Sequence, residues 1–250
     1  MTDLRISTMT AISSIHSDID LNILYQKFTP NETITYMQYG SNEDKGTTGK
    51  VVRKARKPKP KKTFFNQITL HVLCEKSVNV KLFNNGRIQM TGLKYHGHGD
   101  KVVSTLVEQL KQLNDDTHPF MSASCCDIDP ISIACINSDF SLNYPIKRDV
   151  LHREIVNAGY YSSYEPCIYP GVNIKYYFNE LYPGGICQCR AQCTGKGCGT
   201  VDGGCKKVTV AVFQSGKAII TGARSLQQLN TAHSFISTFI QERKQQLTLN

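Results

Sequence analysis

The chain has 250 residues, with 29 Lys and Arg against 20 Asp and Glu, which gives a net charge of +9 at pH 7. Apolar residues make up 40% of it and aromatic residues 9%, so wholesale disorder is excluded. No apolar run is long enough to span a bilayer and no secretory signal is visible, so we expect an intracellular protein whose 10 cysteines are reduced or metal-bound.

The first part of the chain predicts a short helix, a strand and then a basic insertion. The helix is expected near Leu21 to Lys27 and the strand over Thr33 to Tyr39. The insertion covers residues 45–62, and Pro58 and Pro60 exclude a regular helix or a central strand there. Its cations form a basic arm that fits phosphate binding, nuclear import or a solvated loop without a partner: Lys50, Arg53, Lys54, Arg56, Lys57, Lys59, Lys61 and Lys62. The rest of the chain has 21 Lys and Arg against 20 acids, so the net charge belongs to this segment.

An internal repeat follows a further predicted strand over Asn66 to Leu73. Val78 to Lys94 (VNVKLFNNGRIQMTGLK) matches Val208 to Arg224 (VTVAVFQSGKAIITGAR) at a constant offset of 130 residues without gaps. Each copy alternates with period 2 around a Gly-containing turn, which predicts a β-hairpin. The face expected to be buried carries Val78, Val80, Leu82, Ile88 and Met90 in one copy, and Val208, Val210, Val212 and Ile220 in the other.

Helices are expected to cover that apolar face. Apolar residues recur at helical spacing after each hairpin, at Val103, Leu106, Leu110 and Leu113 and again at Ala232, Phe235, Ile236, Phe239 and Ile240. Another helix is predicted near Arg148 to Asn157. The predicted fold class is α+β, with two pseudo-symmetric repeats over residues 1–117 and 118–250 that form a curved antiparallel sheet with helices on its convex face. The second repeat carries a Cys/Gly-rich insertion over residues 178–206.

The opposite, open face of each hairpin holds one phenylalanine, Phe83 or Phe213, among polar and small residues. One interpretation is that each Phe packs under a loop, or that the two faces are reversed. The other is a pair of wedges, because minor-groove proteins insert apolar side chains between base steps and kink the duplex. The residues expected beside them in the groove are Asn79, Lys81, Gln89, Thr91, Thr209, Ala211, Ile219 and Thr221.

The hairpins resemble the repeat of the TATA-binding protein family, which has the form LIF-x-SGK-x-x-x-TGAK. The run SSYEPCIYPG over Ser162 to Gly171 is similar to the family's SSYEPELFPG. With the FFNQ run and the two insertions, the chain looks most like the TATA-binding-protein-like factors of large DNA viruses. The resemblance implies a saddle-shaped fold and the minor-groove wedging and bending for which TATA-binding proteins are themselves a standard example.

The resemblance also implies roles for single residues. The intercalating aromatics would be Phe65, Phe83, Tyr169 and Phe213, with Phe65 taken from FFNQITLHV where the family has RFAAVIMRI. His71 and Lys175 stand where the family places phosphate-contacting arginines, and Glu165 matches a glutamate that helps to bind transcription factor IIB. The family's central asparagines have no clear match: Leu4 or Thr8 aligns in the first half, and Cys135 or Asn137 in the second.

The Cys/Gly-rich insertion contains five cysteines in the spacing C-x-C-x3-C-x4-C-x6-C: Cys187, Cys189, Cys193, Cys198 and Cys205. Four thiolates suffice for a structural zinc site with one thiol to spare. Reduced thiols and disulfides are the alternatives.

The sequence therefore predicts a viral transcription initiation factor that binds promoter DNA, bends it and recruits the viral transcription machinery. We find no catalytic motif and expect no enzyme. The expected partners are double-stranded DNA, a factor similar to transcription factor IIB and RNA polymerase, with no membrane contact and a monomer on DNA. The expected location is the host nucleus or a viral factory, with packaging in the virion as a further option. One alternative is an architectural DNA-packaging protein with the same saddle, and another is a nuclease or glycosylase that borrows a similar fold.

Overall fold

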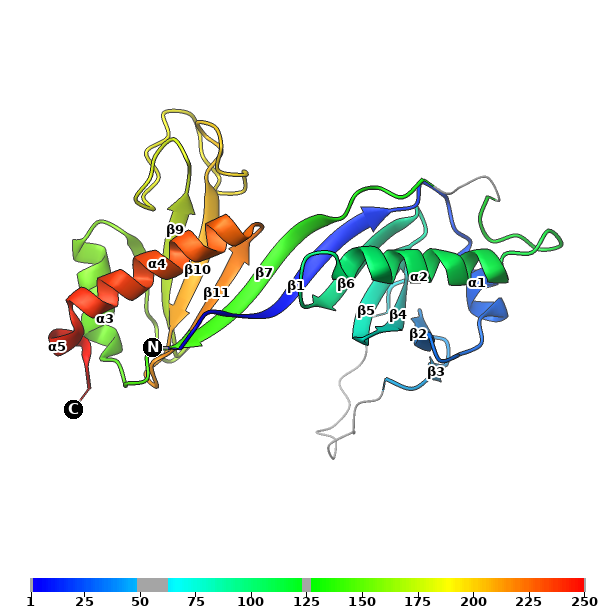
Figure 1. Cartoon of the computed structure of the whole chain (residues 1–250), viewed down its shortest axis with the longest axis horizontal. Coiled ribbons are helices and arrows are strands. Elements are labelled where there is room, and N and C mark those ends of the chain that lie inside the picture. The colour runs from blue at the N-terminus through cyan, green and yellow to red at the C-terminus, as the bar shows by residue number, and fades with distance from the viewer. Residues whose placement is uncertain (1, 49–62, 123–126, 250) are drawn as a thin grey trace. The chain divides into compact units, whose positions relative to one another are not determined.

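The computed structural model describes residues 2–48, 63–122 and 127–249 (Figure 1). The chain divides into two compact units, one formed by Thr10–Ser132 and the other by Met1–Met9 together with Ile133–Asn250. We name them the first-repeat unit and the second-repeat unit. The division falls after Ser132, whereas the sequence placed the domain boundary after residue 117. The basic arm lies outside the described residues.

The first-repeat unit is one sheet with two helices. In chain order it contains the later part of β1 (Arg5–Ser14), α1 (Leu21–Lys27), β2 (Ile34–Tyr39), β3 (Lys45–Gly46), β4 (Gln67–Cys74), β5 (Lys76–Phe83), β6 (Arg87–Leu93) and α2 (His98–Leu113). The strand order is β3-β2-β4-β5-β6-β1, and the pairs from β3 to β6 are antiparallel.

The second-repeat unit repeats this plan. It contains the start of β1, most of β7 (Ser132–Ser141), α3 (Arg148–Asn157), β8 (Tyr161–Ser163), β9 (Val172–Phe178), β10 (Lys206–Val212), β11 (Lys217–Ala223), α4 (Leu226–Glu242) and α5 (Lys244–Leu247). The strand order is β7-β11-β10-β9-β8, and all these neighbours are antiparallel. The predicted helices over Leu21 to Lys27 and Arg148 to Asn157 are confirmed with the same bounds.

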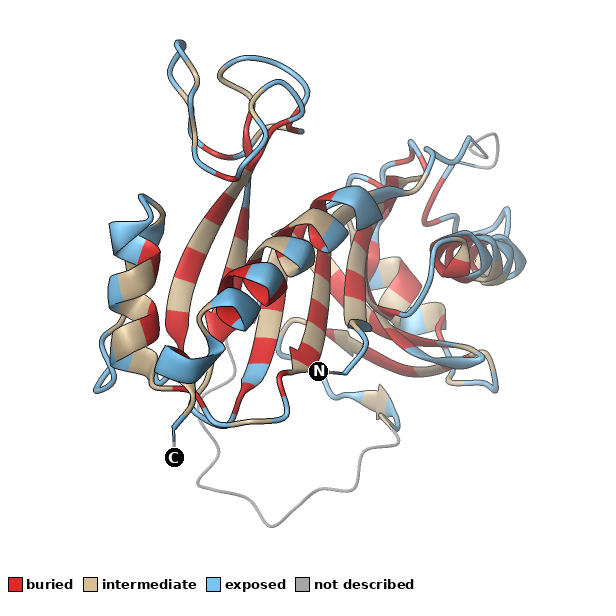
Figure 2. Cartoon of the chain, turned by 60° about the vertical axis from the view of Figure 1, so that its left-hand side comes forward, coloured by how far each residue is buried: buried red, intermediate tan, exposed pale blue. Residues whose placement is uncertain are grey.

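Each core lies between the sheet and its long helix. Helix α2 packs on β4 and β6, and α4 packs on β9, β10 and β11. Figure 2 shows buried and partly exposed residues alternating along the strands, as a half-covered sheet requires. All nine side chains predicted for the buried faces of the hairpins are 0% exposed, and burying each such side chain stabilises the fold by roughly 1.5–3 kcal/mol.

The two hairpins have the same register. Asn79 is paired with Thr91 in one, and Thr209 with Thr221 in the other. Their turns need glycine for two reasons. Gly86 and Gly216 have φ of 75° and 78°, and a Cβ at either position would lie 2.5 or 2.1 Å from a backbone carbonyl oxygen.

Strands β1 and β7 were not predicted from the sequence. Both are ten residues long and share one burial pattern, so residues 127 apart are equivalent. The side chains that face the helices include Met9, Ala11 and Ser13 in β1, and Ser138 in β7. Small and polar residues at buried positions remove the apolar alternation on which the prediction of strands depends. Among the described residues, no helix combines the length and apolar character needed to cross a bilayer.

Candidate nucleic-acid interface

The open face consists of strand residues that point away from the covering helices. All eight residues predicted to face a DNA groove lie there as four cross-strand pairs: Asn79 with Thr91, Lys81 with Gln89, Thr209 with Thr221, and Ala211 with Ile219. Seven of them are partly exposed, whereas Ala211 is 5% exposed because its methyl group is covered by its neighbours. The open face therefore presents polar and short apolar groups without a covering layer.

Two of the four predicted wedges contact each other in the second-repeat unit. The ring centroids of Tyr169 and Phe213 lie 5.8 Å apart at an interplanar angle of 60°. Gly171 lies against both rings, since a Cβ there would be 2.8 Å from the Tyr169 ring and 3.2 Å from the Phe213 ring. The backbone N–H of Tyr169 donates to the Glu165 carbonyl at 2.9 Å, which fixes the loop that carries the ring.

Strand register relates Phe65 and Phe83 to that pair. Ile68 is paired with Leu82, and Val172 with Val212, so residues 104 apart in β4 and β9 are equivalent. This offset maps Phe65 onto Tyr169. Phe65 is 64% exposed, and its ring lies 2.8 Å from the Cβ position of Gly40, so it also covers a glycine.

The same offset maps His71 onto Lys175, but the two side chains differ in access. Lys175 Nζ donates to Thr209 Oγ1 at 3.1 Å on the open face, and burial together with the nearby Lys207 lowers its pKa. His71 is 8% exposed, and its ring lies against that of Tyr36 with centroids 5.0 Å apart. The predicted phosphate contact of His71 is therefore wrong for this conformation, because aromatic packing removes the imidazole from the surface.

The sequence analysis missed an acidic residue on the open face. Asp139 of β7 is paired with Ile219, and its carboxylate accepts hydrogen bonds from Arg5 at 2.9 and 3.1 Å and from the Ser7 hydroxyl. The Ser7 hydrogen bond and the Arg5 guanidinium hold the pKa of this carboxyl below its usual range, so it is charged at neutral pH. A groove of about 970 Å³ runs past it, lined by Asn137, Phe213, Ile219 and Thr221 among others.

The strand registers also place the candidates for the central asparagines. Cys135 and Asn137 both lie on the open face of β7, and their equivalents in β1 are Thr8 and Thr10. Leu4 lies outside β1. The first-repeat unit thus has threonine at the position where the second-repeat unit has Asn137.

Glu165 lies on the surface in the loop between β8 and β9. Its neighbours Cys167 and Ile168 are exposed too, Ile168 to 80%. The loop therefore presents one acid beside an apolar side chain, a surface that a protein partner can contact.

Four of the five insertion cysteines form one group. The Sγ atoms of Cys187, Cys189, Cys193 and Cys205 all lie within 4.8 Å of one another, and Cys205 is 0% exposed. Cys198 is outside the group, and its Sγ lies 2.9 Å from Thr200 Oγ1. The five-cysteine prediction is thus corrected to four, because the turn after Gly197 directs Cys198 elsewhere.

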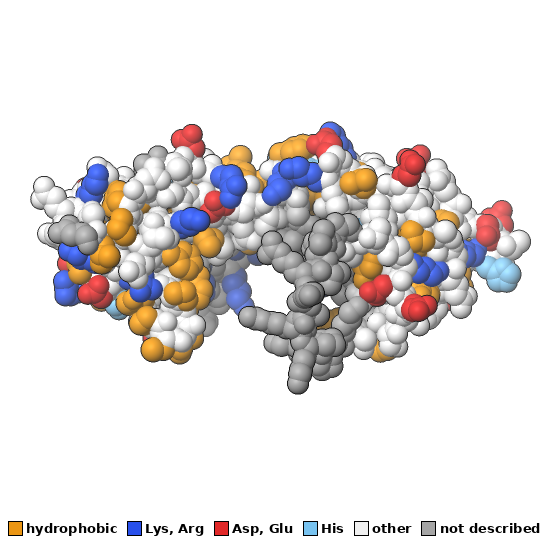
Figure 3. Space-filling view, turned by 90° about the horizontal axis from the view of Figure 1, so that it is seen from below, with side chains coloured by type: hydrophobic (Ala, Val, Ile, Leu, Met, Phe, Trp, Pro, Cys, Tyr) orange, Lys and Arg blue, Asp and Glu red, His pale blue; other side chains and the backbone are white. Residues whose placement is uncertain are grey.

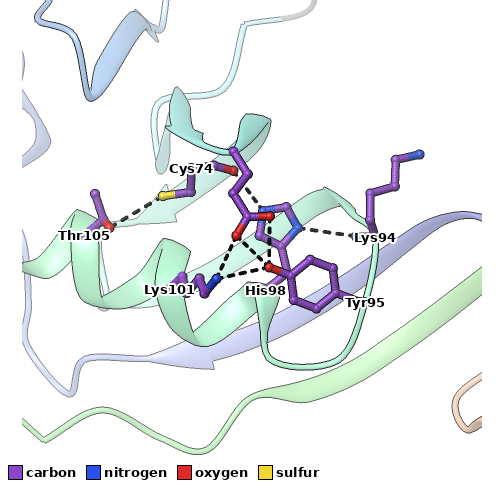
Figure 4. Close-up of polar contacts among 7 residues, drawn as sticks. Cys74, Lys94, Tyr95, His98, Lys101 and Thr105 are labelled. Atoms are coloured by element: carbon purple, nitrogen blue, oxygen red, sulfur yellow. Dashed lines mark hydrogen bonds and ion pairs between the residues drawn. The ribbon is translucent and has the colours of Figure 1, made fainter.

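One side chain in each unit ties a strand connection to the long helix, and the sequence analysis did not find it. His98 is 1% exposed; its Nδ1 accepts the N–H of Lys94 at 3.4 Å, and its Nε2 lies 3.1 Å from the Cys74 carbonyl oxygen (Figure 4). Because Nδ1 accepts, the proton belongs on Nε2, which donates. Beside it, Tyr95 and Lys101 donate to Glu75 at 2.9 and 2.7 Å, which holds the β4–β5 turn.

Gln228 does the same in the second-repeat unit, 130 residues later. Its Oε1 accepts the N–H of Arg224 at 2.8 Å, and its Nε2 donates to the Cys198 carbonyl at 2.8 Å. The constant offset therefore extends from the hairpins to the first turn of each long helix.

Comparison with known proteins identifies this arrangement. Residues 131–243 match the model of the family described as "Transcription factor TFIID (or TATA-binding protein, TBP)". Residues 131–243 form a TBP domain. The resemblance seen in the sequence is thereby confirmed, and the matched range includes the Tyr169–Phe213 pair and the cysteine group.

Relatives extend the TBP resemblance over nearly the whole chain. A "TATA-box-binding protein-like" protein of Acanthamoeba polyphaga mimivirus is 30% identical over 252 residues, which cover 94% of this chain and 64% of the relative. The chain thus spans 64% of the length of that viral relative. The structure of Methanococcus jannaschii TBP superposes with a TM-score of 0.58 at 18% identity, covering 96% of this chain and 99% of the archaeal one. This match confirms the predicted α+β, TBP-like fold class.

Proposed function

We propose that this chain binds double-stranded DNA in the minor groove through its open face and bends it, as a transcription initiation factor of a large DNA virus. The family match of the second repeat and the likeness to a mimivirus TATA-box-binding protein-like protein support this proposal. In it, Phe65, Phe83, Tyr169 and Phe213 are the wedges, and the four cross-strand pairs of the open face contact the groove floor and walls.

The observation that carries the proposal is the Tyr169–Phe213 pair. Two rings that contact each other at 60° cannot both stack flat on one base, but their shared edge can enter a base step and unstack it. Gly171 beneath them lets both rings approach the backbone closely, which braces the wedge from behind. Unstacking costs a few kcal/mol per step, and the bent duplex offsets this by covering more of the sheet.

Charge supports a division of roles between the open face and the basic arm. Figure 3 shows acidic and basic side chains interspersed on one face of the molecule, rather than a single positive field. Phosphate affinity that is independent of sequence would then come mainly from the eight cations of residues 50–62, while the open face selects and deforms the duplex.

Protein partners belong to the same proposal. We infer a factor similar to transcription factor IIB and RNA polymerase as partners, with Glu165 as one contact because its carboxylate is exposed beside Ile168. Reversal of the charge in Glu165→Lys should weaken capture of that factor on DNA without changing the binding of DNA alone.

Bending of DNA tests the proposal. A duplex labelled at both ends should show increased energy transfer when the full chain binds, and Tyr169→Ala with Phe213→Ala should reduce that increase at saturating protein. Leu226→Ala is the control, because Leu226 is 50% exposed but begins helix α4, away from the open face. Bending by the double variant equal to that of the unchanged chain would refute the wedge assignment.

Selection of binding sites from random duplexes separates promoter recognition from DNA packaging. An enriched A·T-containing motif supports a promoter factor. Binding and bending without any enrichment would support the architectural protein instead, because backbone contacts and general deformability carry no fixed sequence.

A further inference from the structure

We propose that Cys187, Cys189, Cys193 and Cys205 bind one Zn²⁺ ion as a tetrahedral tetrathiolate site, and that Cys198 is not a ligand. Four sulfurs around zinc at about 2.3 Å lie about 3.8 Å from one another. The separation of the Cys187 and Cys205 sulfurs is 3.8 Å, that of the Cys189 and Cys205 sulfurs is 3.3 Å, and all four lie within 4.8 Å. The group therefore already has the dimensions of a zinc site.

Donors around the sulfurs fit thiolates. The backbone N–H groups of Gly195 and Cys205 donate to the Cys193 sulfur, and the side chain of Asn179 donates to Cys205 Sγ at 3.5 Å. Four thiols that bind Zn²⁺ release four protons and leave a complex of charge −2. Lys206 and Lys207, which directly follow Cys205 in the chain, supply compensating positive charge.

The backbone of the insertion is built to hold this group. The carboxylate of Asp202 accepts the N–H groups of Arg190 and Ala191, both at 3.0 Å, which fixes the turn between two ligands. Gly197 N–H donates to the Cys205 carbonyl at 3.0 Å, and Lys207 N–H donates to the Gly195 carbonyl at 2.8 Å. These bonds join the third ligand to the start of β10.

The metal would serve the fold of the insertion and the position of β10. Cys205 precedes Lys206, the first residue of β10, and β10 carries Thr209 of the open face. A loop this rich in glycine buries little apolar surface, so metal binding is the available source of folding free energy. The ion would link the distal loop, drawn in yellow in Figure 1, to the sheet at the point where β10 begins.

Metal analysis tests the site. The full chain, purified under reducing conditions without chelator, should contain one zinc per chain by elemental mass spectrometry, and Cys205→Ser should lose it. Cys198→Ser is the matched control and should keep it. Replacement by Co²⁺ should give the visible spectrum of a tetrahedral thiolate complex, identical in the unchanged chain and in Cys198→Ser.

A second measurement guards against simple misfolding of the Cys205 variant. Chelation of the metal from the unchanged chain should expose the insertion to proteolysis, while the strands and helices of the unit stay protected. A metal-free chain with freely alkylated thiols would overturn the proposal. So would disulfides among the four cysteines, or loss of metal in Cys198→Ser.

A different observation carries a second inference: we propose that Asp139 makes the second-repeat half of the open face accept a G·C base pair. This rests on the proposed minor-groove function. In the minor groove A·T pairs present only acceptors, whereas guanine adds its N2 amino donor. A carboxylate on the open face would oppose acceptors and accept a hydrogen bond from that amino group. Asp139 keeps 35% of its side chain exposed while Arg5 holds it in place.

The first-repeat unit supplies the comparison. The equivalent of Asp139 is Ile12, since the strands share one pattern at an offset of 127 residues. Isoleucine offers no hydrogen-bond acceptor. The two halves of the open face therefore read the groove differently, and the preference for guanine should be confined to one side of the selected site.

Site selection with Asp139→Ile and Asp139→Asn tests this inference. The unchanged chain should retain G·C at one position on one side of the motif. Asp139→Ile should shift that position to A·T by on the order of tenfold. Asp139→Asn, which keeps the shape but removes the charge, should give an intermediate shift. Unaltered base preference in both variants would overturn this inference alone, whereas a chain that neither binds nor bends any duplex would overturn the proposed function.

Discussion

At the scale of single residues, the repeat conserves roles rather than residue types. His98 and Gln228 differ chemically, yet each accepts a backbone N–H four residues earlier and donates to the carbonyl of a strand connection. An amide and a neutral imidazole both offer one acceptor and one donor on opposite sides, which is why either fits. Sequence comparison of the hairpins could not reveal this pairing, because it matches function across unlike side chains.

The exchange of these two residues is a direct prediction. His98→Gln should leave the free energy of unfolding nearly unchanged, because Gln228 already forms both bonds in the equivalent place. His98→Ala should lower it by about 1–3 kcal/mol, because it leaves buried backbone groups without partners. Urea unfolding measured by circular dichroism separates the two outcomes, and Gln228→His is the reciprocal control. Equal losses in His98→Gln and His98→Ala would show that the imidazole acts through its shape alone.

At the scale of elements, prediction succeeded where one side of a strand is consistently apolar. The buried hairpin faces and both short helices agree with the sequence because branched apolar residues repeat there at strand or helix spacing. It failed for β1 and β7, whose inner positions include Ala11, Ser13 and Ser138. Tertiary packing allows small and polar groups in these strands, and no local pattern records that.

The site shows the same limit. Sequence comparison found the wedges and the groove pairs, which lie in the repeated hairpins or in matched motifs. It missed Arg5 and Asp139, which lie 134 residues apart and are joined only by the pairing of their strands. It also could not tell which four of five cysteines converge, because the choice depends on the turns between them.

At the scale of the whole molecule, the net charge of +9 concerns affinity rather than recognition. Eight cations lie within residues 50–62, and the remaining residues are nearly neutral. Replacing these eight with Gln should therefore flatten the dependence of DNA affinity on salt, with the log–log slope reduced by up to about 7 if every cation meets a phosphate. The end-to-end energy transfer of the saturated complex should not change, because bending depends on the aromatic wedges.

Titrations of labelled duplex at several salt concentrations measure both quantities in one experiment. The slope reports on phosphate contacts, and the plateau of energy transfer reports on bending. An unchanged slope would show that the basic arm does not meet DNA and would favour nuclear import as its role, since import needs cations but no phosphate. A reduced plateau would instead show that the arm helps to bend the duplex, which would contradict the division of roles between arm and open face. Because the two readouts respond to different residues, each half of the proposal can fail without the other.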